Sequence, residues 1–233
     1  MNLFISTSIS GDCATLVSDE HHHLRKVLRS KPGDSVLISN GEGSVWEAVI
    51  ESVGKDETKC RLLIEHVNYH EPRVKIVLVQ GILKNHGKMD WLVEKGTELG
   101  MTSFWPIHTE RTIAQSVKVD RLRKLAETAM KQCLRGYVPR IENPQHLSSA
   151  LGALREFRLI LFHEGAADEC VPERLEYDER PLALFIGPEG GFSTTEVEYA
   201  KKEGADIVSL GKRRLRGETA GLAALTRITS SLG

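Results

Sequence analysis

The chain of 233 residues is 40% hydrophobic and 27% charged, a composition typical of a globular protein that buries its own core. It has no apolar run of about 18 residues, and its first residues lack the basic and long apolar stretches of a signal peptide, so we expect no membrane association and a cytoplasmic protein. The formal net charge of −1 excludes a polycation that binds nucleic acid without selectivity.

The first 70 residues predict a small β-rich unit. Asp19 is positioned to cap a helix over 20–30, and strands are expected at the ranges 35–39, 44–53 and 59–67. Asn40-Gly41-Glu42-Gly43 is a hairpin signal between the first two of these strands. Consecutive histidines such as those at 21–23 do not share a helix face, so we expect no metal site there. We place a domain boundary near Pro72.

From residue 74 to residue 233 the pattern changes to short apolar runs that alternate with helical periodicity. This alternation predicts an α/β domain with a mostly parallel sheet. The expected strands are 74–80, 103–107, 158–162, 182–186 and 207–210, and the expected helices are 88–99, 120–135, 145–155 and 218–232. Gly100 is expected to end the helix over 88–99.

The segment Gly187-Pro188-Glu189-Gly190-Gly191-Phe192-Ser193 follows the strand predicted over 182–186. Its glycines allow the main chain to approach a ligand, and Ser193 with Glu196 fits a capping box that starts a helix. Because parallel sheets bind ligands at the carboxyl ends of their strands, this turn is a candidate ligand loop. A tight turn without a ligand is the alternative that the spacing leaves open.

A second loop, at 209–217, carries Lys212, Arg213, Arg214 and Arg216 without an acidic residue. Four neighbouring cations favour an anionic partner, although a solvated loop explains them equally well. Glu218 and Thr219 follow at a position where a helix N-terminus favours anionic or capping side chains.

Two weaker motifs complete the set. His163-Glu164-Gly165 follows the strand predicted over 158–162, and by itself it is consistent with an ordinary polar turn. Lys84 lies just before the helix predicted over 88–99 and Lys88 lies at its start, so both could meet phosphate, although ordinary surface lysines account for them as well. The four cysteines form neither a CxxC pair nor a metal-type spacing with histidine, so we expect reduced thiols and no metal.

Together, the ranges 88–100, 187–193 and 210–220 resemble the RsmE family of ribosomal RNA uridine-N3 methyltransferases, and the ranges 24–29 and 31–34 match it as well. The resemblance implies a PUA-like RNA-binding β-barrel over 1–70 and a SPOUT-type methyltransferase domain over 74–233 with a C-terminal trefoil knot. It also implies a homodimer that uses S-adenosylmethionine to methylate one uridine in 16S ribosomal RNA of the small ribosomal subunit.

The resemblance also assigns residues. Those expected to bind the cofactor lie in three strand-end loops: Leu161, Phe162, His163, Glu164, Ile186, Gly187, Pro188, Gly190, Gly191, Leu210, Gly211, Arg213, Leu215, Arg216 and Thr219. Those expected to bind RNA are Arg25, Arg29, Lys84, Lys88, Arg111 and Arg135. The chain departs from the family pattern at Lys131 and Cys133, which puts an RNA contact near Arg135 in question.

Uridine N3 must lose a proton on methylation, so a cation beside the base oxygens would stabilise the developing charge. Arg216 is the first candidate for this catalytic role, and Glu218 is expected to orient Arg216 or to act as a base. Three alternatives stay open: a SPOUT enzyme for another RNA such as transfer RNA, a non-catalytic RNA-binding assembly factor, and a nucleotide-dependent enzyme. The missing P-loop lysine weighs against the last of these.

Overall fold

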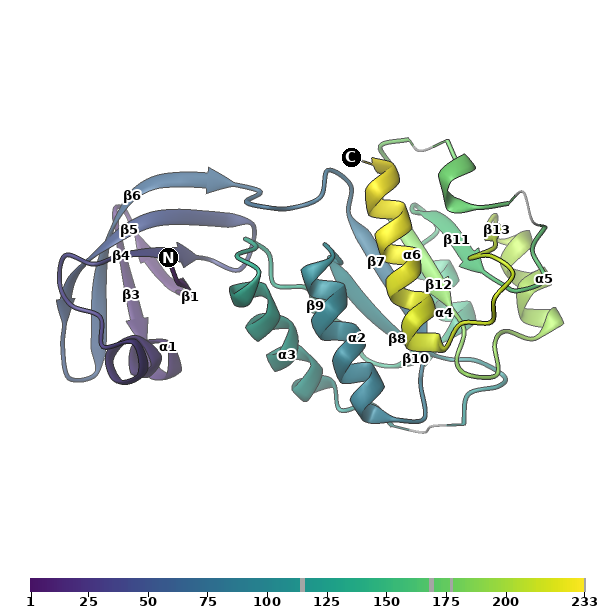
Figure 1. Cartoon of the computed structure of the whole chain (residues 1–233), viewed down its shortest axis with the longest axis horizontal. Helices are drawn as coiled ribbons and strands as arrows, with labels where there is room; N and C mark the ends of the chain where they lie inside the picture. Colours follow the sequence, from purple (N-terminus) through teal and green to yellow (C-terminus); the bar gives the residue numbers. More distant parts are fainter. Residues whose placement is uncertain (114–115, 168–169, 177, 233) are drawn as a thin grey trace. The chain divides into compact units, whose positions relative to one another are not determined.

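A computed structural model describes residues 1–113, 116–167, 170–176 and 178–232. The chain divides into two compact units (Figure 1). The first unit contains residues 1–71 together with 130–138, and the second contains 72–129 and 139–233. The chain therefore passes from one unit to the other three times, whereas the sequence predicted one boundary near Pro72.

The first unit is built on one six-stranded sheet. Its strands are β1 (Leu3–Ile5), β2 (Ser8–Ser10), β3 (Cys13–Val17), β4 (Ser35–Ser39), β5 (Ser44–Val53) and β6 (Glu57–Val67), in the spatial order β1-β4-β5-β6-β3-β2. The β1–β4 pair is parallel and the other pairs are antiparallel. Phe4, Leu16, Ile38, Ile50 and Leu62 come from five different strands and share one buried core, so the sheet curls around that core.

The helix expected over 20–30 is shorter and irregular. An α-helix, α1 (Ser18–His22), is followed by a π-helix, η1 (His23–Leu28). Asp19 lies inside α1 and does not cap it, because the helix starts one residue earlier, at Ser18, and has no side-chain cap. The buried His21 fastens this segment to the sheet: its Nδ1 lies 2.8 Å from Thr58 Oγ1 and its Nε2 lies 3.1 Å from the Lys55 carbonyl.

Residues 130–138, which we name the return segment, pack against the first unit. Met130, Leu134 and Val138 join a cluster whose other members include Leu3 and Leu37. The Gly136 carbonyl accepts a hydrogen bond from Gly43 N at 3.0 Å, and an added Cβ at Gly136 would lie only 2.6 Å from the Gly43 carbonyl oxygen. The sequence places the return segment in the second domain, over 74–233, whereas its contacts are with residues of the first unit that lie far away along the chain.

The second unit contains a parallel sheet and the helices that cover it. Its elements are β7 (Ile76–Gly81), α2 (His86–Glu98), β8 (Ser103–His108), α3 (Val119–Gln132, whose end enters the return segment), β9 (Arg140–Ile141), β10 (Gln145–His146), α4 (Leu147–Ala153), β11 (Arg158–Phe162), η2 (Pro172–Arg174), β12 (Leu182–Ile186), α5 (Thr194–Lys202), β13 (Asp206–Val208) and α6 (Gly217–Leu232). The strand order is β10-β8-β7-β12-β11-β13, with β9 beside β8, and every pair is parallel. The predicted α/β class with a parallel sheet is therefore confirmed.

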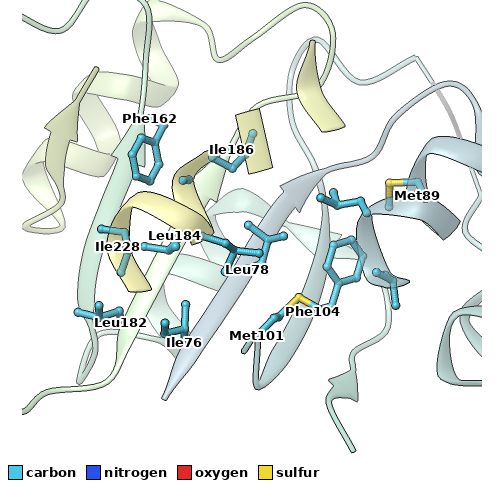
Figure 2. Packing of buried hydrophobic residues seen from close by; sticks show 14 of the residues in the cluster. Ile76, Leu78, Met89, Met101, Phe104, Phe162, Leu182, Leu184, Ile186 and Ile228 are labelled. Atoms are coloured by element: carbon cyan, nitrogen blue, oxygen red, sulfur yellow. The ribbon is translucent and has the colours of Figure 1, made fainter. Parts of the chain in front are cut away.

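Alternate residues of the central strands point to opposite faces of this sheet, as the period of a β-strand requires. Ile76, Leu78 and Leu184 pack in one layer with α2 and α6, and Figure 2 shows this layer around Ile228. Val79 and other alternate residues of the strands pack in the second layer with α4 and α5. Both faces of the sheet are thus covered, which explains the uninterrupted apolar runs of β7, β11 and β12. Among the described residues, no helix is long and apolar enough to cross a bilayer.

The cysteines differ in burial, which predicts an order of reactivity. Burial raises the pKa of the Cys60 thiol to about 11, with Cys13 and Glu51 adding to the rise, whereas Cys170 is exposed. Since the thiolate is the reacting form, a disulfide reagent at pH 8 should modify Cys170 first and Cys60 only after unfolding. Mass mapping of the labelled protein measures this order, and early labelling of Cys60 would contradict the burial of its side chain.

Candidate functional site

The carboxyl ends of four neighbouring strands lie side by side in the sheet of the second unit. Gln80 of β7 pairs with Ile186 of β12, Ile186 pairs with Phe162 of β11, and Phe162 pairs with Val208 of β13. Three loops therefore leave the same edge of the sheet: a histidine turn (163–165), a glycine loop (187–193) and an arginine loop (209–216). Ligands of open α/β sheets bind at this edge, so the loops form the candidate site.

The glycine loop passes against β7 at a distance that no side chain would permit. A Cβ added to Gly81 would lie 2.4 Å from Pro188 N and 2.5 Å from Pro188 Cδ. A Cβ added to Gly187 would lie 2.9 Å from the Gly191 Cα, so the loop also folds tightly on itself. Glycine at these positions is therefore required by packing, and what the loop offers a ligand is its main chain.

A capping box fixes the end of the glycine loop, as the sequence predicted. Ser193 Oγ accepts from Glu196 N at 3.2 Å, and Glu196 Oε2 accepts from Ser193 N at 2.8 Å, so α5 begins at Thr194. The other oxygen of Glu196 accepts from Glu110 N at 2.8 Å. Arg111 also contacts this loop, because its Nη1 donates to the Gly190 carbonyl at 2.9 Å.

Gln80 is a site residue that the sequence analysis did not identify. Its side chain is fully buried at the end of β7, and its Nε2 donates to the carbonyls of Gly81 and Gly187, each at 3.1 Å. Its Oε1 is also buried, and no described residue forms a hydrogen bond with it. The available signal was a single polar residue that ends an otherwise apolar strand just before a glycine.

The arginine loop exposes its cations. Lys212, Arg213, Arg214 and Arg216 are all exposed, and the described residues provide the Arg216 side chain with no hydrogen bond or ion pair. Gly211 adopts a φ of +106°, a conformation that favours glycine, and its N–H donates to Ser209 Oγ at 3.0 Å. The half-buried side chains of Leu210 and Leu215 lie at the two ends of this basic stretch, and the exposed Thr219 lies in the first turn of α6.

Glu218 does not pair with Arg216, as the sequence suggested it would. Its Oε1 instead lies 3.0 Å from Lys88 Nζ of α2, and its Oε2 is buried and has no hydrogen-bond partner among the residues that the structure describes. Glu218 is only 8% exposed. A buried carboxylate needs an opposite charge nearby, and Lys88 supplies it. This pair uses one of the three N–H donors of the Lys88 ammonium, whose side chain is 29% exposed.

The histidine turn is held mainly by its main chain. His163 N donates to the Val208 carbonyl at 3.0 Å, and His163 Nδ1 accepts from Gly165 N at 3.0 Å, whereas Glu164 is exposed. The side chains of Leu161, Phe162 and Ile186 belong to the two core layers. Residues at these strand ends can therefore serve a ligand chiefly through main-chain groups.

The cations proposed for RNA occupy different settings. Lys84 is exposed, and its N–H donates to Glu189 Oε1 at 3.0 Å. In the first unit, Arg29 is exposed, and the exposed Arg25 donates to the Lys55 carbonyl at 2.9 Å. Arg135 is different: its side chain is 2% exposed, so the expectation that it contacts RNA is corrected to a structural role within the first unit.

Glu71 is the partner that explains the burial of Arg135. Arg135 Nη2 donates to Glu71 Oε2 at 2.5 Å and Arg135 Nε donates to Glu71 Oε1 at 3.2 Å. Glu71 Oε1 also accepts from Tyr137 N at 3.0 Å, which fastens the carboxylate to the return segment.

No group of three metal-ligating side chains occurs among the residues that the structure describes.

Comparison with known proteins places this arrangement in a family. A family model described as an RNA methyltransferase domain matches residues 70–229, and a model described as an RNA methyltransferase PUA domain matches residues 18–63. The chain is 30% identical to ribosomal RNA small subunit methyltransferase E of Bacillus subtilis over 230 residues, which cover 92% of this chain and 89% of the relative.

Solved structures agree over almost the whole chain. Ribosomal RNA small subunit methyltransferase E from Neisseria gonorrhoeae, bound to S-adenosyl methionine, superposes with a TM-score of 0.89 at 27% identity and covers 99% of this chain and 97% of its own. A probable rRNA-methyltransferase from Porphyromonas gingivalis gives a TM-score of 0.88 at 30% identity, and the match covers 100% of this chain and 98% of that protein. The chain thus belongs to the RsmE family of RNA methyltransferases, with an N-terminal PUA-type β unit and a parallel α/β methyltransferase domain.

Proposed function

We propose that this protein transfers the methyl group of S-adenosylmethionine to N3 of one specific uridine in 16S ribosomal RNA of the small ribosomal subunit. The observation that carries the proposal is the convergence of the histidine turn, the glycine loop and the arginine loop at one edge of the parallel sheet. The family membership and the relatives' printed activity on small-subunit ribosomal RNA support the choice of substrate.

The residues present fit S-adenosylmethionine. The glycine loop brings main chain to the sheet edge where side chains would collide, and the related structure from Neisseria gonorrhoeae binds this cofactor. We assign cofactor contacts to His163 and Glu164, to Gly187–Gly191, to Leu210, Gly211, Arg213, Leu215 and the main chain of Arg216 in the arginine loop, and to Thr219 in the first turn of α6. When bound, S-adenosylmethionine supplies an electrophilic methyl group, and the protein positions reactants and stabilises charge.

Arg216 is the residue that we assign to charge stabilisation. Uridine N3 carries a proton at neutral pH, so negative charge develops on the base oxygens as this proton passes to solvent water. The Arg216 guanidinium is exposed on the arginine loop and is not paired with Glu218, so it is available to a base at this edge. Glu218 then acts by holding Lys88 against the first turn of α6, which makes a role as general base less favoured.

RNA would be bound by exposed cations in both units. We assign Arg25 and Arg29 of the first unit and Lys84 and Arg111 of the second to phosphate contacts, since cations give the sequence-independent part of RNA affinity. The target base must leave its stack to reach the site. The homodimer and the trefoil knot that the family resemblance implies stay predictions.

Replacing Gly81 by alanine tests whether the glycine loop holds the cofactor. We expect the dissociation constant for S-adenosylmethionine to rise at least about tenfold, because the new Cβ would lie 2.4 Å from Pro188 N and displace the loop. Calorimetric titration measures the affinity. Gly152→Ala is the matched control, since α4 leaves 4 Å of open space around that position. If both variants bound S-adenosylmethionine with the same affinity, the glycine loop would have no part in cofactor binding.

The proposed function as a whole is tested by mapping modified nucleosides. Small-subunit ribosomal RNA from cells that lack the protein should lose one methylated uridine, and the purified protein with S-adenosylmethionine should restore it, as mass spectrometry would detect. Cofactor binding with methylation of a different RNA would point to another substrate. Tight RNA binding without any cofactor binding would point to an assembly factor.

A further inference from the structure

We infer that Gln80 is a positioning residue that fixes the glycine loop in its cofactor-binding conformation. The inference rests on the proposed function, because it assigns a task to a residue beneath the same loop. Gln80 is the last residue but one of β7, and its side chain lies where β7, the glycine loop and the start of α6 come together.

The hydrogen bonds of Gln80 define which way its amide points. Nε2 donates to the carbonyls of Gly81 and Gly187, so both N–H groups of the amide face carbonyl oxygens. The reversed amide would place Oε1 against those two oxygens, where only repulsion results. Gln80 therefore joins the strand it belongs to with a loop 107 residues further along the chain.

Two glycines of α6 leave room for this amide. A Cβ at Gly221 would lie 3.2 Å from Gln80 Oε1, and a Cβ at Gly217 would lie 3.7 Å from Gln80 Nε2 and 2.6 Å from Leu83 Cδ2. The helix can approach β7 closely because these positions carry no side chain. The amide is thus enclosed by the strand, the loop and the helix.

Stability of the core does not explain the choice of glutamine. Oε1 is buried with no hydrogen-bond partner in the described part of the chain, which costs free energy that an apolar residue of similar size would avoid. The neighbouring β7 residues are Val and Leu, so an apolar side chain would suit the strand. What glutamine adds is a donor for the Gly187 carbonyl. The planar peptide between Gly187 and Pro188 turns as one unit, so holding that carbonyl sets the direction of the loop.

The experiment compares Gln80→Met, Gln80→Glu and Thr97→Val. Methionine and glutamate keep about the size of glutamine but lose its amide donor. Thr97→Val is the control, because it alters another buried polar residue, whose hydroxyl donates to the Val93 carbonyl within α2. Each variant is titrated with S-adenosylmethionine by calorimetry, its thermal midpoint is recorded, and KM is measured separately for the cofactor and for ribosomal RNA.

We expect both Gln80 variants to show about tenfold weaker cofactor binding and a similar rise in the KM for S-adenosylmethionine, with the KM for RNA unchanged. Thr97→Val should bind the cofactor as the wild type does. Cofactor affinity at the wild-type level in Gln80→Met would overturn the inference. So would Gln80 variants whose RNA affinity falls as many fold as their cofactor affinity and whose thermal midpoint also falls, because such a loss would reflect general destabilisation. A wild type that fails to bind S-adenosylmethionine would overturn the proposed function and this inference with it.

Discussion

Replacing Arg216 by alanine is expected to lower the turnover number at least about a hundredfold while the affinity for S-adenosylmethionine stays within a few-fold. Loss of one group that stabilises developing charge costs about 10² to 10³ in turnover in well-studied enzymes. Arg216 is exposed and has no ion-pair partner among the described residues, so its removal leaves no buried charge behind and should not weaken the fold. The measurement is the initial rate of methyl transfer at saturating cofactor and RNA.

Arg214→Ala is the matched control for this prediction, because it removes the same charge from the same exposed loop. We expect it to weaken RNA binding at low salt but to keep turnover at saturating RNA within a few-fold of the wild type. If Arg216→Ala and Arg214→Ala behaved alike in turnover, Arg216 would have only an electrostatic part in RNA binding.

Replacing Arg135 by methionine is expected to destabilise the first unit by about 3–5 kcal/mol, the usual cost of removing one partner from a buried ion pair. The variant leaves the Glu71 carboxylate, whose side chain is 9% exposed, without its guanidinium partner. It also loosens the return segment, since Glu71 accepts from Tyr137 N as well. Urea titration followed by circular dichroism measures the change in the free energy of unfolding.

The double variant Arg135→Met, Glu71→Gln provides the control for charge. It removes the unpaired carboxylate, so we expect it to recover a large part of the lost stability, and a double-mutant cycle isolates the pairwise energy. A loss below about 1 kcal/mol in Arg135→Met would place this pair among the weak ion pairs that are typical of protein surfaces.

The sequence was most informative where local pattern and burial agree. The bounds expected for β4, β5, β11 and β12 match the structure, because turn residues flank each strand and β-branched or apolar residues fill it. β1 and β2 were not predicted. Each has three residues, and their alternation is too short to stand out from the surrounding chain. The π-helix after α1 also has no simple periodic signature.

The site shows the same division between local and distant effects. The glycine loop and its capping box were predicted because all their determinants lie within one short segment. Lys88 and Glu218 are 130 positions apart in the chain (218 − 88), and Arg135 and Glu71 are 64 positions apart. Contacts of this kind depend on the completed packing, which explains why the roles expected for Arg135 and Glu218 needed correction.

The return segment has a consequence for the order in which the protein matures. A chain leaves the ribosome from its N-terminus, and domains tend to fold as they emerge. Here the first unit lacks the partners of Leu3, Leu37 and Glu71 until residue 138 has been synthesised, by which time β7, α2 and β8 have already been synthesised in full. A fragment that ends at Glu71 would expose an apolar surface and an unpaired acid. Residues 1–71 alone are therefore not a complete domain that could be transferred to another protein unchanged.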